Sequence, residues 1–174
     1  LQDTIRMAQE RQDWYRDYCR QQDMAPLDWP GSCRIDQFDE ALAKTRKLLG
    51  GGKRPKQFSD YYRQLREHME ELGVLVMRNA VVGSNTHRPP NKDEFRGFAI
   101  ADDYAPLIFI NTKDSPQAQV FTLLHEFAHL LLGESGVSDL GTNNEHQVER
   151  FCNRLAAEYL VPGKQFTQQW QPST

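Results

Sequence analysis

The segment VFTLLHEFAHLLLGES, from Val120 to Ser135, places two histidines and a glutamate inside a run that is otherwise mostly apolar. A helix that is apolar on nearly every side is typical of a protein core. Burying imidazole and carboxylate groups in such a helix is unfavourable unless they are paired, hydrogen-bonded or bound to a metal. The segment therefore predicts a central helix whose polar side chains share one task.

The spacing of these polar residues indicates what the task is. His125 and His129 are four positions apart, which places them one turn apart on the same face of a helix. With Glu126 between them they form an HExxH motif, in which two imidazoles bind Zn²⁺ and the glutamate acts as a base toward the attacking water. Short motifs also arise by chance, and two hydrogen-bonded core histidines are the alternative interpretation.

A third metal ligand is expected from the next helix. Glu149 lies twenty residues after His129, and a returning helix brings such a residue back over the first one. We expect Glu149 to complete the ligand set, with His146, one turn earlier on the same helical face, as the second choice. Asp139 and Glu134 in the connecting segment are further competitors.

The rest of the chain predicts helices and short strands around this central helix. Helices are expected over residues 3–20, from an Asp36 cap to Gly50, from Ser59 to Gly73, from Pro116 to Leu132, and from Asn143 or Asn144 to just before Pro162. Ser115 should cap the central helix, and Gly133 should end it in a left-handed conformation. Three short segments rich in β-branched and aromatic residues, VLVMR, FRGFAIA and LIFIN, predict a small three-stranded antiparallel sheet.

These elements predict an α+β fold in one compact domain. A chain of 174 residues that is 39% hydrophobic is large enough for one sizeable core. A helical N-terminal segment, residues 1–72, is expected to pack on a core formed by residues 73–174. LIFIN directly precedes the central helix, so its edge could pair with an extended substrate, although it could equally be an internal strand.

Charge and cysteine content exclude several classes of function. A net charge of −3 without a basic stripe argues against direct nucleic-acid binding and against a membrane-surface role. No apolar run reaches the length of a membrane span. Cys19, Cys33 and Cys152 are odd in number and form no CxxC pair, which fits a protein of the reducing cytoplasm. The chain begins at Leu1 rather than at Met, so a longer polypeptide is expected.

Several segments resemble one known family. FTLLHEFAHLLLGES and VERFCNRLAAEYLVP, preceded by FRGFAIADDYAPLIFIN, resemble the ImmA/IrrE zinc metallopeptidases. The resemblance implies a minigluzincin-like zincin core, with an HExxH helix, a small sheet and a glutamate-bearing helix. It also implies a cytoplasmic regulatory endopeptidase of the stress response that cuts a DNA-binding repressor or a toxin–antitoxin regulator. RQDWYRDYCRQQDMAPLDWPGS is similar to the segment that follows an XRE-type helix-turn-helix domain in fused members of the family.

The resemblance also implies roles for further residues. HExxH followed by Glu149 and Asn153 is similar to the thermolysin-like gluzincins, in which the residue at the last position is an Asp that supports a ligand histidine. An amide lacks that charge, yet its oxygen can still orient an imidazole N–H. Glu126 is the expected catalytic base. Spacing does not choose among the chemically able oxyanion stabilisers, which are His146, Arg150, Tyr159, His87 and Tyr104.

Two questions of chemistry stay open in the sequence. The ligand set suits Zn²⁺, but Mn²⁺ or another divalent ion is also compatible with two imidazoles and a carboxylate. The same residues could also serve a non-catalytic regulatory or antitoxin-like binding module with a structural or vestigial metal site. Such a closed site would need a fourth protein ligand, for example His146, in the position that an enzyme leaves open. Arg96 could neutralise a nearby carboxylate or could be a solvated strand residue.

Overall fold

A computed structural model describes residues 1–50, 54–78, 95–137 and 143–161 of the chain. In chain order, its elements are α1 (Gln2–Gln21), α2 (Phe38–Leu49), α3 (Phe58–Glu71), β1 (Leu75–Arg78), β2 (Gly97–Ile100), β3 (Leu107–Ile110), α4 (Pro116–Leu132), β4 (Gly136–Val137) and α5 (Asn143–Leu160). The predicted α+β class is confirmed. Among the described residues, no helix is both long and apolar enough to cross a bilayer.

The sheet is mixed rather than wholly antiparallel. Its strand order is β1-β3-β2-β4, with β2 antiparallel to both β3 and β4, and with β1 parallel to β3. A short connection joins β2 to β3 and imposes antiparallel pairing, whereas β1 enters from α3 on the other side of β3. Residue type alone does not reveal relative strand direction, and the two-residue β4 is too short to be recognised from composition.

The position of β3 decides between the two interpretations of LIFIN. Both edges of β3 are occupied, one by β1 and the other by β2. It is therefore an internal strand, and the expectation that its edge could pair with a substrate is wrong. Its four residues are all buried, which agrees with a central position.

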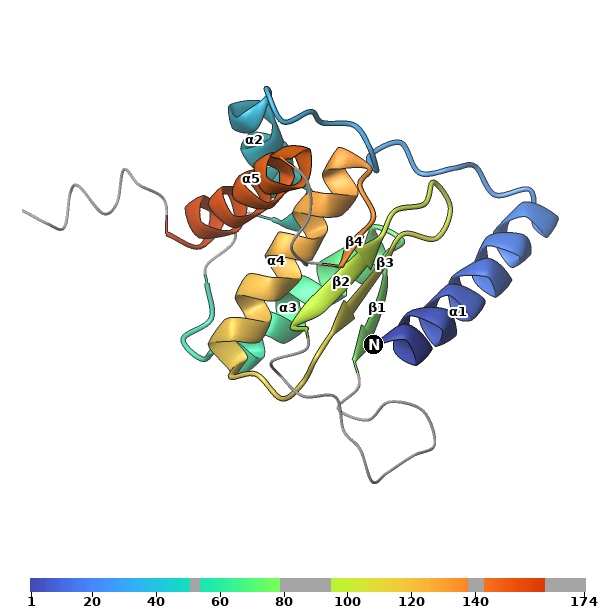
Figure 1. The fold of residues 1–174 in the computed structure, drawn as a ribbon, viewed down its shortest axis with the longest axis horizontal. Helices are drawn as coiled ribbons and strands as arrows, with labels where there is room; N and C mark the ends of the chain where they lie inside the picture. Colours follow the sequence, from blue (N-terminus) through green and yellow to red (C-terminus); the bar gives the residue numbers. More distant parts are fainter. Residues whose placement is uncertain (51–53, 79–94, 138–142, 162–174) are drawn as a thin grey trace, which may run out of the picture.

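The sheet lies between α1 on one side and the other helices on the opposite side (Figure 1). Successive side chains of a strand point to opposite faces, so Ile108 and Ile110 join the main core with α4, while Leu107 and Phe109 join a smaller cluster with α1. α3 and α5 pack beside α4, and α2 packs against α5. The central helix is thereby enclosed by other elements on most of its circumference.

Local signals fixed the ends of α4 as predicted. The hydroxyl of Ser115 accepts a hydrogen bond from the backbone N–H of Ala118 at 3.3 Å, and Pro116 occupies the first turn, where its missing N–H costs nothing. Gly133 ends the helix with φ 70°, a left-handed conformation that glycine adopts without strain. Both predicted ends are confirmed.

The predicted Asp36 cap of α2 is wrong. The residue at the cap position is Gln37, whose side chain makes no capping hydrogen bond. The carboxylate of Asp36 instead accepts two hydrogen bonds from the guanidinium of Arg34, at 3.1 and 2.8 Å. A charged partner two residues away competes successfully for the carboxylate, since charge-assisted hydrogen bonds are the stronger ones.

Polar contacts hold α1 on the sheet. The side-chain amide of Gln12 donates to the carbonyl oxygens of Ile100 and Ala105, at 3.2 and 2.8 Å. Arg16 Nε donates to Asp102 at 2.6 Å. These contacts bury the side chain of Gln12, which is 2% exposed, whereas Tyr18 on the same helix is 45% exposed.

Candidate metal centre

The polar residues of the HExxH motif lie on the buried face of α4. The exposed fractions of His125, Glu126 and His129 are 6%, 1% and 2%. Apolar neighbours such as Phe127 and Leu130 are completely buried and fill the rest of the helix surface, with the ring of Phe127 stacked on Trp29 at 5.1 Å. Dense packing of this kind holds the motif in a fixed orientation.

Three ligand atoms converge between α4 and α5. Nε2 of His125 lies 3.1 Å from Nε2 of His129. Glu149 brings one carboxylate oxygen to 3.2 Å from Nε2 of His125 and the other to 3.1 Å from Nε2 of His129. The three residues therefore form a group that could hold a metal ion.

These separations fit a tetrahedral cation. Two ligand atoms at bond lengths of about 2.0 Å from a tetrahedral Zn²⁺ lie about 3.3 Å from each other. The two imidazole nitrogens are 3.1 Å apart, close to that value, and each has a different oxygen of the Glu149 carboxylate at 3.1 to 3.2 Å. Two imidazoles and a carboxylate are also a donor set that zinc accepts, and other divalent ions can bind it. The residues present thus fit a resident divalent metal.

Asn153 fixes the orientation of one ligand. Its amide oxygen lies 3.0 Å from Nδ1 of His125, and because that oxygen only accepts, Nδ1 carries the proton and donates. The neutral ring then presents the lone pair of Nε2 to the space shared with His129 and Glu149. The expected supporting role of Asn153 thus has a geometric basis, whereas Nδ1 of the buried His129 has no partner among the described residues.

The two carboxylates at the centre have opposite electrostatic environments. The imidazoles of His125 and His129, which contact its oxygens, hold the pKa of the Glu149 carboxyl well below its usual range. Burial raises the pKa of Glu126 well above its usual value, and the charge of Glu149 raises it further. Within the described part of the chain, Oε2 of Glu126 is buried without a hydrogen-bond partner. A group that must accept and later return a proton benefits from this raised pKa.

A cavity of about 160 Å³ opens beside the ligands. It is lined by Arg96, Phe121, Thr122, His125, Glu126, Glu149 and Asn153. Sequence reasoning did not assign Phe121 or Thr122 to the site, although Phe121 lies four residues before His125 and Thr122 four residues before Glu126, which places each pair on one helical face. Arg96 is the residue directly before β2, and no spacing rule connects it to the HExxH motif.

Gly97 allows β2 to lie directly on α4. A Cβ atom at this position would lie 2.7 Å from the carbonyl oxygen of Phe109 and 2.8 Å from Cγ2 of Thr122. It would also approach Oε1 of Glu126 to 3.4 Å. The absence of a side chain at Gly97 thus permits this close approach of β2 to α4. The adjacent Arg96 lines the cavity, and its Nε lies 3.8 Å from Oδ2 of Asp114.

The remaining candidates lie away from the convergent group. His146 is exposed on α5 and is outside the set of three ligands. The hydroxyl of Tyr159 donates to the carbonyl oxygen of Gly50 at 3.2 Å. Tyr104 lies under the guanidinium of Arg20, at 5.3 Å.

None of the other weighed residues joins the site within the described ranges. Arg150 and Glu134 are exposed, and neither lines the cavity or belongs to the ligand group. His87 and Asp139 lie outside the described residues. Among the described candidates for the third ligand, Glu149 is therefore the one whose carboxylate lies beside the two imidazoles, and among the described residues Arg96 is the cation of the cavity lining.

Comparison with known proteins finds one matching family and one similar curated protein. The family model Peptidase_M78, described as the IrrE N-terminal-like domain, matches residues 69–174, which is more than half of the chain. A curated protein from Deinococcus deserti, "Radiation response metalloprotease IrrE", is 42% identical over 65 residues. That alignment covers 33% of this chain and 23% of the relative, so the chain spans about a quarter of the length of that protein.

Proposed function

The chain belongs to the Peptidase_M78 family of IrrE N-terminal-like domains, and from that membership we propose that it is a metal-dependent endopeptidase. One observation carries the proposal. Ligand atoms of His125, His129 and Glu149 converge within 4.8 Å of one another in the site that Glu126 also lines, and Oε2 of this buried carboxylate has no hydrogen-bond partner among the described residues. A buried charged group without a partner is costly, and proton transfer gives it a function.

The ligands and their neighbours divide the work of peptide hydrolysis. A divalent ion, for which Zn²⁺ is the first choice, would supply Lewis acidity when bound by His125, His129 and Glu149. Glu126 takes a proton from the attacking water and returns it to the leaving amine. Asn153 holds the ring of His125 in the tautomer that leaves Nε2 free to bind.

Arg96 is our candidate for stabilising the carbonyl oxygen during attack. Negative charge develops on that oxygen in the transition state, and a positioned donor there is typically worth several kcal/mol of barrier. Arg96 lines the cavity, and its side chain is 69% exposed, so it can reach a substrate bound there. Of the oxyanion candidates weighed from the sequence, the four that the structure describes, His146, Arg150, Tyr159 and Tyr104, do not line this cavity.

The non-catalytic alternative receives less support. A structural zinc site is normally closed by four protein ligands. Within the described residues, the convergent group has three members, and His146, the expected fourth, is not one of them. A site with three protein ligands and an adjacent cavity is the arrangement of a catalytic metal.

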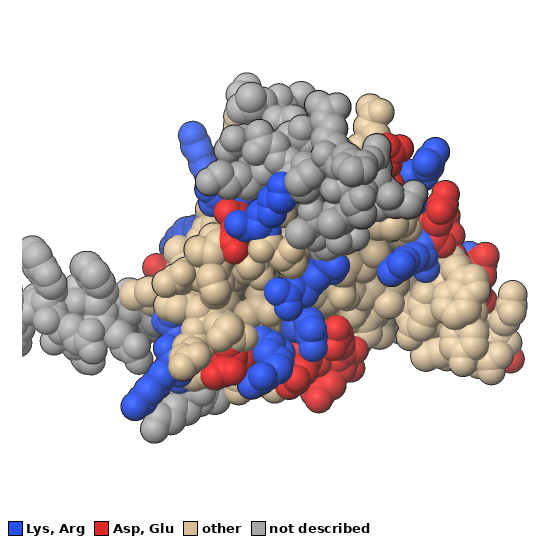
Figure 2. Space-filling model, turned by 90° about the horizontal axis from the view of Figure 1, so that it is seen from below, with Lys and Arg blue, Asp and Glu red and all other residues tan. Residues whose placement is uncertain are grey.

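For the substrate we propose a DNA-binding repressor or a toxin–antitoxin regulator, cut in the cytoplasm as part of a stress response. The support is the family resemblance and the name of the relative, which links that protein to a radiation response. The surface is also consistent with a protein partner, because Figure 2 shows basic and acidic side chains interspersed over one face rather than gathered into a broad basic patch.

Co-expression with a transcription regulator encoded next to this chain tests the activity and the substrate together. We expect mass spectrometry to find one new terminus in the regulator, which a chelator prevents. Glu126→Gln removes the proton carrier while preserving size, so it should bind metal and leave the regulator intact. Glu134→Gln, the same change at an exposed residue, is the control and should cleave normally. Equal cleavage by Glu126→Gln and by the unmodified chain would contradict the mechanism.

A further inference from the structure

The edge of the sheet opposite β4 is open in the described part of the chain. β1 pairs only with β3, so one side of its backbone has no strand beside it. The N–H of Leu75 donates to the carbonyl oxygen of Pro106 on the β3 side, and peptide groups alternate in direction along a strand. The N–H and C=O of Val76 therefore point to the open edge, where another strand could bind them.

The side chains of this edge strand are apolar and only partly covered. Leu75, Val76 and Met77 are half-buried, whereas all four residues of β3 are buried. Natural proteins usually protect an open edge with charged residues, proline or a covering segment, because an exposed apolar edge promotes strand pairing. The one charged residue of β1, Arg78, is already engaged by Gln119 and by the ring of Tyr62.

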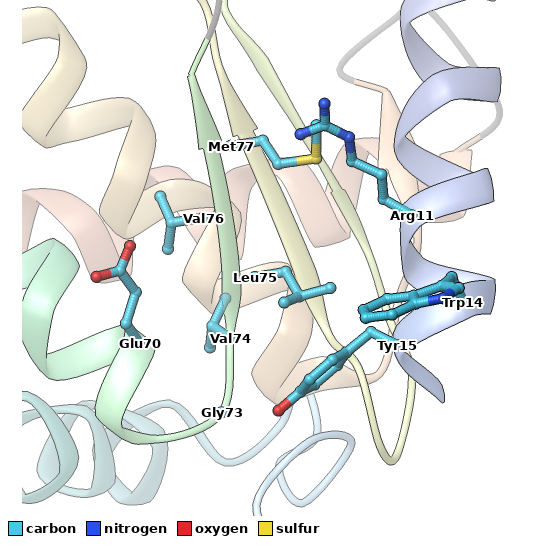
Figure 3. Close-up of a pocket in the computed structure, with 9 residues that line it drawn as sticks. All are labelled: Arg11, Trp14, Tyr15, Glu70, Gly73, Val74, Leu75, Val76 and Met77. Carbon is cyan, nitrogen blue, oxygen red and sulfur yellow. The ribbon is translucent and has the colours of Figure 1, made fainter. Parts of the chain in front are cut away.

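A groove of about 460 Å³ runs along this edge (Figure 3). Its floor is the strand from Gly73 to Met77, and its walls are Glu70 at the end of α3 and the α1 residues Arg11, Trp14 and Tyr15. We call this the α1–β1 groove. It is within the volume range of ligand-binding pockets. It shares no lining residue with the cavity at the metal centre.

The α1 wall of the groove has the composition of a binding surface. Trp14 is 70% exposed, although its ring is stacked on that of Tyr18 at 6.0 Å and is therefore supported from one side. Trp, Tyr and Arg are enriched at protein interfaces, because rigid rings provide contact area at a low cost in conformational entropy. An exposed but pre-ordered tryptophan beside an open strand can bind the side chains of an incoming strand.

Charge indicates what such a strand should carry. The other arginines of α1 are engaged: Arg6 with Asp3, Arg16 with Asp13 and Asp102, and Arg20 with the ring of Tyr104. Arg11 has no such partner among the described residues, and Figure 3 shows its side chain beside Met77 at one end of the groove. Glu70 on the opposite wall lies 3.6 Å from Arg66. The unpaired charge of the groove is thus positive.

We propose that the α1–β1 groove binds an extended segment of a partner protein as an added β-strand, with apolar side chains against Trp14 and Leu75 and an acidic side chain opposite Arg11. Backbone pairing with Val76 supplies affinity that does not depend on sequence, while the groove walls select the side chains. The surface lies at the sheet edge remote from the metal centre, so it serves recruitment of a partner rather than peptide hydrolysis.

A displayed library of random linear peptides, selected on the Glu126→Gln form of the full chain, tests the proposal. We expect the selected peptides to alternate apolar residues and to share an acidic position. Trp14→Ala and Arg11→Glu should each weaken their binding by about tenfold, whereas Arg6→Glu, the same charge change outside the groove on the same helix, should not. Replacing the acidic residue of a selected peptide by lysine should restore binding to Arg11→Glu. Bound peptide should slow hydrogen exchange at the amide of Val76.

Three results would overturn the proposal. The first is a failure to enrich any peptide. The second is binding that Trp14→Ala and Arg11→Glu leave unchanged, which would locate the peptides elsewhere. The third is a stable dimer of the unmodified chain that Trp14→Ala dissociates in analytical ultracentrifugation, since a second copy would then occupy the edge. Both groove variants change exposed side chains, and thermal melts identify any loss of folding separately.

Discussion

Nδ1 of His125 on α4 donates to the amide oxygen of Asn153 on α5 across 3.0 Å, although 28 residues separate the two in sequence. This hydrogen bond fixes the tautomer of the imidazole and directs its second nitrogen toward His129 and Glu149. It also connects α4 and α5, the two helices that carry the candidate metal ligands. Asn153 occupies the place at which the gluzincin pattern has aspartate, so the support is neutral rather than charged.

Asn153→Ala should reduce metal affinity by about 10- to 100-fold, because the ring of His125 loses its orienting partner. Asn153→Asp keeps an acceptor at the same place and should retain the affinity or increase it. Competition for Zn²⁺ against a chromophoric chelator measures both. Equal affinity of the alanine variant and the unmodified chain would show that packing alone orients His125.

Metal binding should stabilise the folded chain. An ion that binds only the native state at about 100 times its dissociation constant adds about 2.7 kcal/mol to the free energy of unfolding. Zn²⁺ should therefore raise the melting temperature, and His129→Ala should lose that increase. His146→Ala, on the exposed side of α5, should keep it. If Zn²⁺ raised the melting temperature of His129→Ala but not that of His146→Ala, His146 rather than His129 would be a ligand.

Arg96→Ala should lower kcat by about 100-fold while leaving KM nearly unchanged, since stabilisation of a developing charge acts on the transition state. Arg96→Lys keeps the charge but not the planar donor group, and it should recover part of the loss. Steady-state kinetics on a cleaved regulator measures the division between kcat and KM. An effect confined to KM would instead make Arg96 a residue that binds the substrate in its ground state.

Gly97→Ala should destabilise the fold by about 1–3 kcal/mol, because the new methyl group would overlap Phe109 and Thr122 and push β2 away from α4. Chemical denaturation measures the free energy of unfolding. Thr122→Ser removes the methyl group on one side of the contact, so the double variant should recover part of the loss. If Gly97→Ala left the free energy of unfolding unchanged, β2 would be able to shift away from α4 without cost. The metal site would then tolerate a change in the position of β2.

Tyr62 should make the fold sensitive to alkaline pH. Burial raises the pKa of its hydroxyl to about 12, with the nearby Arg78 acting in the opposite direction. Because the folded-state pKa is above the ordinary value of 10.0, the stabilisation is complete below pH 10 and is lost as the pH rises to about 12. Tyr62→Phe should reduce that alkaline loss by about 2–3 kcal/mol. Denaturation at neutral and at high pH, compared for the two chains, measures the difference.

At neutral pH the same substitution should cost little. The hydroxyl of Tyr62 is buried without a hydrogen-bond partner among the described residues, so its removal leaves no donor or acceptor unpaired. A large loss of stability at neutral pH would indicate that the hydroxyl has a partner in solution.

The sequence by itself determined the features that depend on neighbours a few residues apart. The four-residue spacing of His125 and His129 fixes their common face on any helix, and Ser115 and Gly133 fix where that helix begins and ends. Glu149 was predicted as a ligand because a returning helix brings it near the motif, and the structure places its carboxylate there. Each of these inferences uses helix geometry, which is the same in every protein.

The tertiary structure alone decided what depends on elements distant in sequence. Strand order made LIFIN an internal strand and β1 an edge, since residue type does not specify which strands become neighbours. Gly97 permits a close approach of β2 to α4, and Arg96 next to it lines the cavity, a proximity to the motif that no spacing encodes. Tyr159 turns to Gly50 instead of the metal ligands, because packing of several elements chooses among side chains that are chemically equivalent in sequence.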